Sequence, residues 1–466
     1  MENNHKRGSF TGSLGFVLAA AGSAVGLGNI WRFPYLAAKD GGGVFLLCYL
    51  VLALTFGFTL LTTEIAIGRK TGQSPLTAYR MLNKRTGWVG VIACLIPAMI
   101  LPYYCTIGGW VLKYLGTYIT GGSAAATADG YFTGFITSQW APIIWFLIFL
   151  SATFFVVYKG VDKGIEKLSK YLMPVLVVLI LGIAIFSLTL KHTDADGTTR
   201  TGLQGFLVYI VPNFDGMTFK QFFVILMDAM GQLFYSISVA MGIMITYGSY
   251  VKKDTNLIKS VNQIEIFDTA VALLAGMMIV PAVFTFMGTE GMAAGPSLMF
   301  VSLPKVFAAM GGIGPFIGIL FFVMVFFAAV TSSVSVLEAI VSSVMDKFKT
   351  ERKKATIIVT LLTAVVGIIV CLGYNVFYFE LTLPNGSVGQ ILDIMDYISN
   401  YVLMPVVAIS TCILVGWVLK PQYIIDEVSL NGEKFSRRLL YIVMVKVVTP
   451  VLLFFLLLQS LGVFSL

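Results

Sequence analysis

One segment of the sequence, residues 20–34, is apolar enough to cross a membrane but poorly suited to a continuous helix. It lies within an apolar stretch, residues 14–38, that exceeds the ~20 residues of a membrane-spanning helix. Its middle nevertheless contains helix-weakening and polar residues: Gly22, Gly26, Gly28, Asn29, Arg32 and Pro34. Broken backbone at membrane depth is tolerated only where it is buried in protein or lines a cavity. We therefore predict a span interrupted at a binding site for a cation and an anion. A glycine-rich packing seam between helices is the alternative.

The composition agrees with a membrane protein. Of the 466 residues, 58% are hydrophobic and only 12% are charged, whereas soluble domains carry about 25% charged residues. The net charge of +8 does not indicate a nucleic-acid partner, because the basic residues gather in alternate loops. The cysteines lie in apolar segments without the spacing of metal ligands, and we expect them to be packing residues.

The hydropathy pattern predicts an all-α polytopic membrane protein with eleven transmembrane helices. The predicted spans are 14–38, 43–68, 87–119, 141–158, 168–190, 219–248, 261–287, 313–344, 355–374, 389–418 and 438–464. Lysines and arginines follow the even-numbered spans, and the opposite loops are poor in them. The positive-inside rule therefore predicts an inner (plasma) membrane protein with a cytoplasmic N-terminal segment, residues 1–13.

A second interrupted span is predicted at residues 232–242, where serines and a glycine break the apolar run Q-L-F-Y-S-I-S-V-A-M-G. Two interrupted spans in corresponding positions indicate a transporter site near the bilayer midplane. We predict an inverted five-plus-five repeat with broken helices 1 and 6. The predicted parts are a first five-helix repeat (14–190), an extracellular loop (191–218), a second repeat (219–418) and an eleventh helix (438–464).

Few ionisable or hydroxyl-bearing residues remain inside the other spans. Such residues are costly in a membrane and by default mark a transport pathway. They include Tyr104, Asp268, Glu338, Asp396 and the run 331–333. Three further acids, Glu64, Asp228 and Asp393, are predicted near the ends of spans, where a side chain can reach water. We do not assign these three to the central site.

The run G-S-A-V-G-L-G-N-I-W-R-F-P, followed by glycines at 41–43, resembles the first span of the neurotransmitter:sodium symporter family. Residues 232–242 and the A-A-V-T-S-S run at 328–333 agree with the same family. The resemblance extends from about Phe10 to the end of span 10 and is greatest to the bacterial eleven-span amino-acid transporters. It implies a bundle of spans 1, 2, 6 and 7 that rocks against a scaffold.

The resemblance implies two sodium sites. The first comprises Ala24, Asn29, Ser236 and Asp268, and the substrate carboxylate completes it. The second comprises Gly22, Val25, Ala328, Thr331 and Ser332. Both shells contain only oxygen ligands, which suit a hard cation such as Na⁺.

The resemblance also implies a substrate pocket. Its residues are Leu27, Gly28, Ile100, Tyr104, Tyr235, Ser238, Met241, Ser332 and Val336. Gly26 stands where monoamine carriers of the family place an aspartate, so the substrate is expected to supply its own carboxylate. The apolar Ile100, Met241 and Val336 favour a hydrophobic L-amino acid.

Gate residues follow from the same resemblance. Arg32 and Asp396 correspond to the outer pair, and Arg7 and Asp346 correspond to the inner pair. Phe10 stands where relatives often have tryptophan. At Asp268 many relatives place asparagine and use a bound chloride, so we expect this chain to need no chloride.

The sequence thus predicts a sodium-coupled importer of hydrophobic L-amino acids that works by alternating access in a lipid bilayer. We expect a monomer or weak dimer. A channel is disfavoured because the sequence contains no repeated filter loop. A membrane receptor would need a signalling domain, and no loop is long enough for one. An enzyme is disfavoured because the sequence has only two histidines and shows no pairing of a nucleophile with a base.

Overall fold

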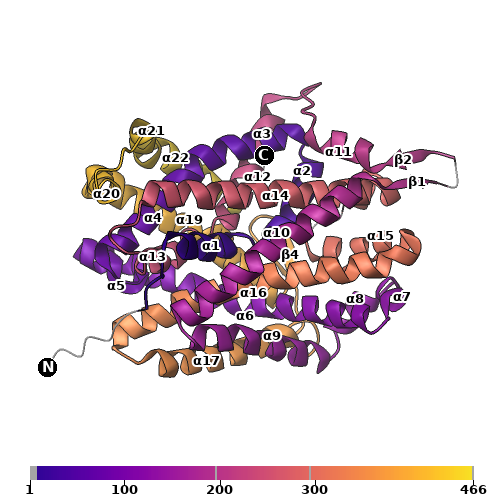
Figure 1. Cartoon of the computed structure of the whole chain (residues 1–466), viewed down its shortest axis with the longest axis horizontal. Helices are drawn as coiled ribbons and strands as arrows, with labels where there is room; N and C mark the ends of the chain where they lie inside the picture. Colours follow the sequence, from indigo (N-terminus) through magenta and orange to yellow (C-terminus); the bar gives the residue numbers. More distant parts are fainter. Residues whose placement is uncertain (1–7, 195–196, 293–294, 464–466) are drawn as a thin grey trace.

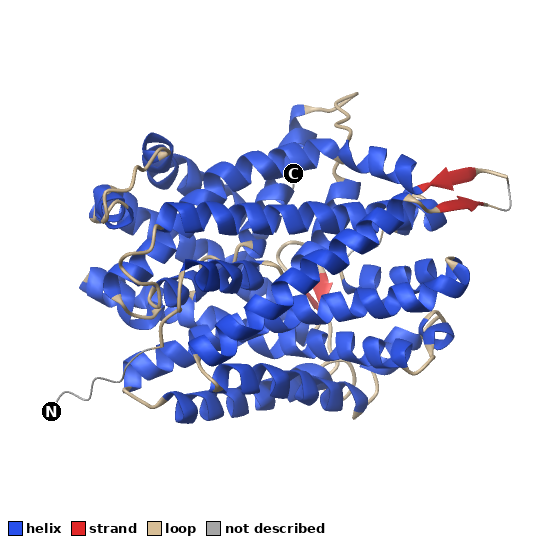
Figure 2. Cartoon of the chain, viewed as in Figure 1, coloured by secondary structure: helices blue, strands red, loops and turns tan. Residues whose placement is uncertain are grey.

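The computed structural model describes residues 8–194, 197–292 and 295–463. Its helices run largely side by side, and only two short strand pairs interrupt the helical pattern (Figure 2). The antiparallel pairs are β1 (Lys191–Thr193) with β2 (Thr199–Thr201), and β3 (Leu381–Thr382) with β4 (Val388–Gly389). Both pairs lie in loops between long helices.

Within the described residues, nine helices are long and apolar enough to cross a membrane. They are Gly43–Thr71, Lys84–Ile119, Ala141–Tyr158, Val161–Leu188, Leu257–Met287, Gly311–Phe348, Arg352–Leu372, Ile391–Val418 and Arg438–Ser460. Their main α-helical parts are α3 (Gly43–Leu52), α4 (Phe58–Thr71), α6 (Gly87–Ile119), α9 (Ala141–Tyr158), α10 (Lys167–Leu188), α14 (Leu257–Met287), α16 (Gly314–Phe348), α17 (Arg352–Leu372), α18 (Ile391–Asp396), α19 (Met404–Ile413), α21 (Arg438–Val443) and α22 (Thr449–Ser460).

Several spans also contain π-helical turns. These are η1 (Gly28–Arg32), η2 (Ala53–Gly57), η4 (Val161–Glu166), η8 (Tyr397–Leu403), η9 (Leu414–Val418) and η10 (Met444–Val448), and a further one is η6 (Leu298–Ser302). Short helices connect the spans: α5 (Pro75–Leu82), α7 (Ser123–Ala126), α8 (Tyr131–Ile136), α11 (Gly202–Ile210), α15 (Leu303–Ala309) and α20 (Gln422–Val428).

The first span is broken where the sequence predicts it. α1 (Ser13–Ala24) and the helix Gly28–Lys39, which ends with α2 (Phe33–Lys39), are bent by 56° at the break. Pro34 does not cause the break, because it lies in the first turn of α2. The π-helical turn η1 precedes Pro34 in the same helix, and Pro34 lies six residues after that helix begins at Gly28.

The sixth span is also broken. α12 (Phe219–Ser236) and α13 (Ile243–Gly248) are separated by six unwound residues. Ser238 and Ala240 have φ angles of 55° and 62°, a left-handed conformation that non-glycine residues rarely adopt. Taken as one interrupted span, α12 and α13 bring the structure into agreement with the eleven predicted spans. The division into two repeats stays a prediction.

The broken spans lie among the long helices (Figure 1). α6 packs along α16, α10 along α14, and α4 along α13. The last contact is between backbones: a Cβ at Gly68 would lie 2.0 Å from the Ile245 carbonyl oxygen, and one at Gly248 would lie 2.3 Å from that of Ile65. These two glycines therefore allow span 2 and the second half of span 6 to pack directly together.

Candidate functional site

A small cavity lies where the two broken spans meet α6 and α16. It has a volume of about 30 Å³, which leaves no room for an amino acid unless the lining moves apart. All nine predicted substrate residues line it: Leu27, Gly28, Ile100, Tyr104, Tyr235, Ser238, Met241, Ser332 and Val336. The structure therefore brings this predicted set together.

The polar end of the cavity is formed by the break in the first span. The Leu27 N–H points at the Tyr104 hydroxyl oxygen, 3.4 Å away. A Cβ at Gly26 would lie 2.9 Å from Ser332 Oγ and 3.1 Å from the Tyr104 hydroxyl. Neither distance leaves space for a side chain in this arrangement. The protein therefore offers N–H and hydroxyl donors at this end and no carboxylate at position 26.

Three of the four residues predicted for the first sodium site are in direct contact. Asn29 Nδ2 lies 2.9 Å from Ser236 Oγ and 3.0 Å from Asp268 Oδ1, and Ser236 Oγ lies 2.9 Å from the same carboxylate oxygen. Ala24, the last residue of α1, lines the cavity beside them. Asp268 is fully buried, and no lysine or arginine of the described chain forms an ion pair with it. A buried carboxylate without a basic partner favours a bound cation.

The residues predicted for the second sodium site also converge. Ser332 Oγ lies 3.3 Å, 3.1 Å and 3.1 Å from the carbonyl oxygens of Gly22, Ser23 and Val25. These carbonyls are at the end of α1, where the helix no longer supplies all their donors. Beside them, Thr331 Oγ1 lies 3.1 Å from the Ala328 carbonyl oxygen. The set offers hydroxyl and carbonyl oxygens to one cation.

Glu64 supports the unwound segment of the sixth span, and its assignment to the end of a span was wrong. The helix continues to Thr71, so Glu64 lies about two turns inside it and is fully buried. Its Oε1 accepts a hydrogen bond of 2.6 Å from the N–H of Ala240 in the unwound segment. An unwound segment inside a span has N–H groups that need acceptors. A lone intramembrane acid beside an interrupted span is thus the signal that could have identified Glu64.

The other two acids placed at span ends behave as predicted. Asp228 pairs with Lys39 at 2.8 Å, and both side chains are partly exposed. Asp393 accepts a 3.0 Å hydrogen bond from the Gln390 N–H in the first turn of α18. Glu338, by contrast, is fully buried and forms a double hydrogen bond with Arg352, both at 2.7 Å. This pairing indicates a structural role for Glu338.

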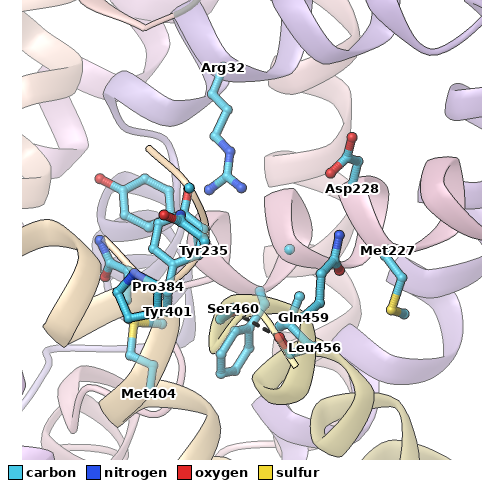
Figure 3. A pocket seen from close by; sticks show the side chains of 16 residues that line it. Arg32, Met227, Asp228, Tyr235, Pro384, Tyr401, Met404, Leu456, Gln459 and Ser460 are labelled. Atoms are coloured by element: carbon cyan, nitrogen blue, oxygen red, sulfur yellow. Dashed lines mark hydrogen bonds between the residues drawn. The ribbon is translucent and has the colours of Figure 1, made fainter. Parts of the chain in front are cut away.

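A larger cavity of about 530 Å³ lies on the other side of Tyr235, between α12, α19 and α22. Arg32 points into it from one wall and Asp228 lies across from it (Figure 3). The Arg32 guanidinium carbon is 5.6 Å from the centre of the Tyr401 ring. Tyr235 lines both cavities, so the larger one is next to the small central one.

Arg32 and Asp396, the predicted outer pair, form no ion pair with each other in the described chain. Asp396 Oδ1 instead accepts hydrogen bonds of 2.9 Å from Tyr103 and 2.5 Å from Asn400. Tyr103 lies on α6 and Asn400 lies one helical turn after Asp396, while Arg32 remains near enough for electrostatic attraction to the Asp396 carboxylate. The gate assignment stays a prediction that requires Asp396 to change partners.

On the opposite side, Phe10 is buried in an aromatic cluster. Its ring centre lies 5.6 Å from those of Phe16 and Tyr247 and 6.2 Å from that of Tyr250. Asp346, one member of the predicted inner pair, accepts a 2.7 Å hydrogen bond from the Ser74 N–H. Arg7, the other member, lies outside the described residues. Phe10 therefore packs between α1 and the second half of the sixth span.

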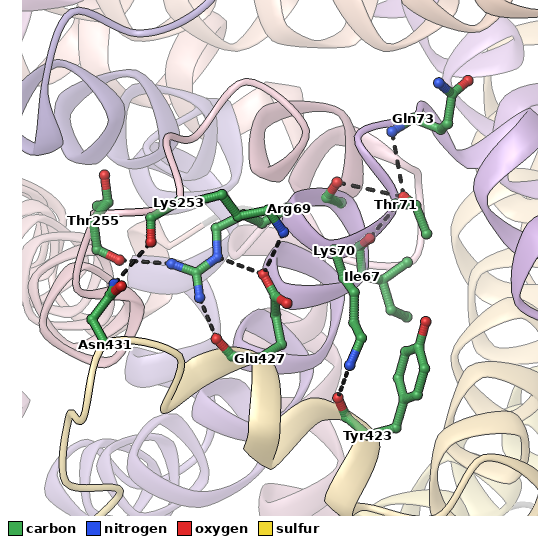
Figure 4. A network of polar contacts seen from close by, with 11 residues as sticks. Ile67, Arg69, Lys70, Thr71, Gln73, Lys253, Thr255, Tyr423, Glu427 and Asn431 are labelled. Atoms are coloured by element: carbon green, nitrogen blue, oxygen red, sulfur yellow. Dashed lines mark hydrogen bonds and ion pairs between the residues drawn. The ribbon is translucent and has the colours of Figure 1, made fainter.

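A buried charge network joins α20 to the end of span 2 (Figure 4). Arg69 Nε donates to Glu427 Oε1 at 2.8 Å, Nη1 donates to the Thr255 carbonyl at 2.7 Å, and Nη2 donates to the Glu427 carbonyl. Lys253 also contacts Glu427 Oε1, at 3.1 Å. Lys70 donates to the Tyr423 carbonyl at 2.8 Å and lies over the Tyr423 ring. The network ties span 2 and the loop after span 6 to the segment between spans 10 and 11.

The chain is similar to named transporters over almost its whole length. An uncharacterized sodium-dependent transporter of Bacillus subtilis is 33% identical over 97% of this chain and 97% of its own. One from Haemophilus influenzae is 32% identical over 93% of each chain. The sodium- and chloride-dependent GABA transporter 2 of Rattus norvegicus is 25% identical over 81% of this chain and 69% of its own.

Solved structures and the family model agree with these relatives. The crystal structure of MhsT in complex with L-phenylalanine is 34% identical, covers 97% of this chain and 100% of its own, and superposes with a TM-score of 0.83. The model of the sodium:neurotransmitter symporter family matches residues 7–129 and 136–465. Together with the two broken spans and the cavity between them, these matches show that the chain belongs to the sodium:neurotransmitter symporter family.

Proposed function

We propose that this protein imports hydrophobic L-amino acids together with two sodium ions, by alternating access and without chloride. The observation that carries the proposal is the convergence of two oxygen clusters and one amino-acid-lined cavity at the breaks of spans 1 and 6. Membership of the family makes the chain a sodium-dependent membrane transporter and not an enzyme.

The cavity supports an amino acid as the substrate. At one end, the Leu27 N–H and the Tyr104 hydroxyl are donors for a carboxylate. At the other end, Ile100, Met241 and Val336 offer apolar surface, and a methionine adapts to side chains of different shape. The relative MhsT, whose structure contains L-phenylalanine, supports the same class of ligand.

Coupling to sodium is supported by segments that contribute residues both to the sodium clusters and to the substrate pocket. Asn29 and Ala24 of the first cluster flank the residues that face the substrate carboxylate, so a sodium ion there would contact substrate and protein together. The second cluster joins the end of α1 to Ser332 on α16, and therefore spans the boundary between bundle and scaffold. A cation at each cluster would stabilise the broken spans in the closed arrangement.

Independence from chloride is supported by the surroundings of Asp268. Its carboxylate is held by Ser236 and Asn29 and lies 3.4 Å from the Tyr49 hydroxyl. Two sodium ions and a zwitterion carry a net charge of about +2 into a site of low dielectric, where uncompensated charge is costly. Asp268 supplies a fixed negative charge at that place. No additional glutamate or bound chloride is then needed near the first sodium cluster to compensate the positive charge.

The proposal extends to the location of the protein. Basic residues after the even-numbered spans favour a cytoplasmic N-terminus by the positive-inside rule, and we propose that the protein lies in the inner (plasma) membrane. We propose a functional unit that is a monomer or weak dimer, because the central site is built by residues of one chain.

Uptake into proteoliposomes tests the proposal. Labelled leucine or phenylalanine should accumulate with an inward sodium gradient, with a sigmoidal sodium dependence and equal rates in chloride and gluconate. Unlabelled hydrophobic L-amino acids should compete and charged ones should not. Counterflow of labelled substrate separates a carrier from a receptor, which binds without exchange. Full uptake under a proton gradient alone would overturn the proposal.

A further inference from the structure

Lys446 is a cation on the outer face of the eleventh span. It lies in η10, eight residues after the helix begins at Arg438, or ~12 Å along a helix with a rise of 1.5 Å per residue. The neighbouring Val443 and Val447 are 45% and 53% exposed. Only 33% of the most apolar window of this span is buried inside the protein. In a family of membrane transporters this surface faces lipid.

The ammonium of Lys446 has no carboxylate partner and no hydrogen-bond acceptor among the described residues. A lysine at this depth extends toward the membrane interface and requires an acceptor there. The charge therefore needs a partner from outside the chain.

Trp417 of η9 lies beside Lys446. Its indole Nε1 donates a 3.1 Å hydrogen bond to the Lys446 carbonyl, and its ring centre lies 5.7 Å from the Lys446 ammonium. Pro450, four residues further along, has no N–H to offer that carbonyl. The ring, 63% exposed, is thus fixed next to the ammonium on the lipid-facing surface.

Two other cations lie near Lys446, one at the end of span 10 and one at the start of span 11. Lys420 follows Trp417 by three residues, and Arg438, at the start of span 11, donates 2.9 Å to Gln422 Oε1. Anionic headgroups attract basic residues near a membrane surface, and tryptophan favours the same interface. A soluble acidic partner would not reach a lysine surrounded by exposed apolar side chains.

We propose that Lys446 and Trp417 form a binding site for the phosphate of an anionic phospholipid, in the leaflet next to the loop between spans 10 and 11. The ammonium binds the headgroup phosphate, and the acyl chains lie along Val443 and Val447. Lys420 and Arg438 add to the attraction at the headgroup level. The site is separate from the central cavity, so it does not depend on the substrate proposed above.

Trp417 provides a built-in probe. The protein is placed in phosphatidylcholine nanodiscs that contain a small, fixed fraction of either brominated phosphatidylglycerol or brominated phosphatidylcholine, since bromine quenches nearby tryptophan. The signal of Trp417 is the difference between wild type and Trp417→Phe. We expect about fivefold stronger apparent binding of the brominated anionic lipid at Trp417, the factor of one basic residue at an anionic surface.

Control variants separate the proposal from general charge attraction. Lys446→Gln should abolish the preference and Lys446→Arg should retain it. Lys353→Gln should leave the preference unchanged, because Lys353 is far from Trp417 in the sequence and pairs with another ring. Its ammonium lies 5.6 Å from the centre of the Tyr158 ring. Trp140, which is 67% exposed directly before α9, should show no preference. A circular dichroism spectrum and a thermal unfolding midpoint equal to those of wild type would show that Lys446→Gln is folded.

Two results would overturn the inference. Equal quenching of wild-type Trp417 by the two brominated lipids would show that no anionic lipid is selected. A preference that survives Lys446→Gln in a folded protein would assign the selection to other residues. Loss of transport in wild type would refute the proposed function but would leave the lipid measurement valid.

Discussion

Replacement of Glu64 by alanine tests whether the unwound segment of span 6 is held by a single side chain. Glu64 Oε1 accepts a 2.6 Å hydrogen bond from the Ala240 N–H, and both residues are buried. Alanine would leave that N–H unpaired, which costs about 1–3 kcal/mol. The left-handed backbone at Ala240 costs a further ~1–3 kcal/mol that the surrounding contacts must support.

The expected loss falls on substrate binding, because Ser238 and Met241 of the same segment line the central cavity. A loss of about 1–3 kcal/mol corresponds to roughly 5- to 150-fold weaker binding. Equilibrium binding of labelled amino acid to purified protein in sodium gives this number directly. Glu64→Gln is the matched control, because its side-chain carbonyl can still accept from the Ala240 N–H.

Glu64→Ala protein that binds substrate as tightly as wild type would refute the reasoning. It would show that the segment keeps its conformation without this acceptor. Equal losses in Glu64→Gln and Glu64→Ala would show instead that the negative charge of Glu64 is what matters. Circular dichroism on both variants checks that the helices remain intact.

Three further predictions concern the carboxylate end of the central cavity, the first sodium cluster and the network at α20. Tyr104→Phe should weaken substrate binding by ~1.5–3 kcal/mol, the value of a hydrogen bond to a charged group, and strong competition by decarboxylated amines would contradict a carboxylate at that position. Asp268→Asn should be inactive or newly dependent on chloride, whereas normal sodium-driven uptake in gluconate would place the charge elsewhere. Arg69→Gln should lower the free energy of unfolding by about 1.5–3 kcal/mol, the value of a hydrogen bond to a charged group, because Glu427 loses Arg69 and keeps Lys253 as its basic partner. Thermal unfolding measures this loss, and in the same measurement Lys39→Gln, which breaks the exposed pair of Lys39 and Asp228, should cost less than ~1 kcal/mol.

The sequence alone identified features that depend on local backbone chemistry. Glycines and polar residues within an apolar run predict an interrupted span, and both breaks lie where they were expected, after Ala24 and after Ser236. The resemblance then supplied the cavity residues, all of which line one cavity. Such patterns are visible because a break is caused by the residues at the break.

Only the tertiary structure decided which side chains meet across spans. Glu64 was placed at a membrane end because apolar periodicity sets the ends of a helix only to within several residues. Asp396 accepts a hydrogen bond from Tyr103, and Lys446 lies beside Trp417, although neither pairing follows from sequence spacing. With 3.6 residues per turn, a shift of one residue rotates a side chain by about 100°. The partner of a charged group is therefore fixed by the rotation and depth of each helix against its neighbours, which no local pattern specifies.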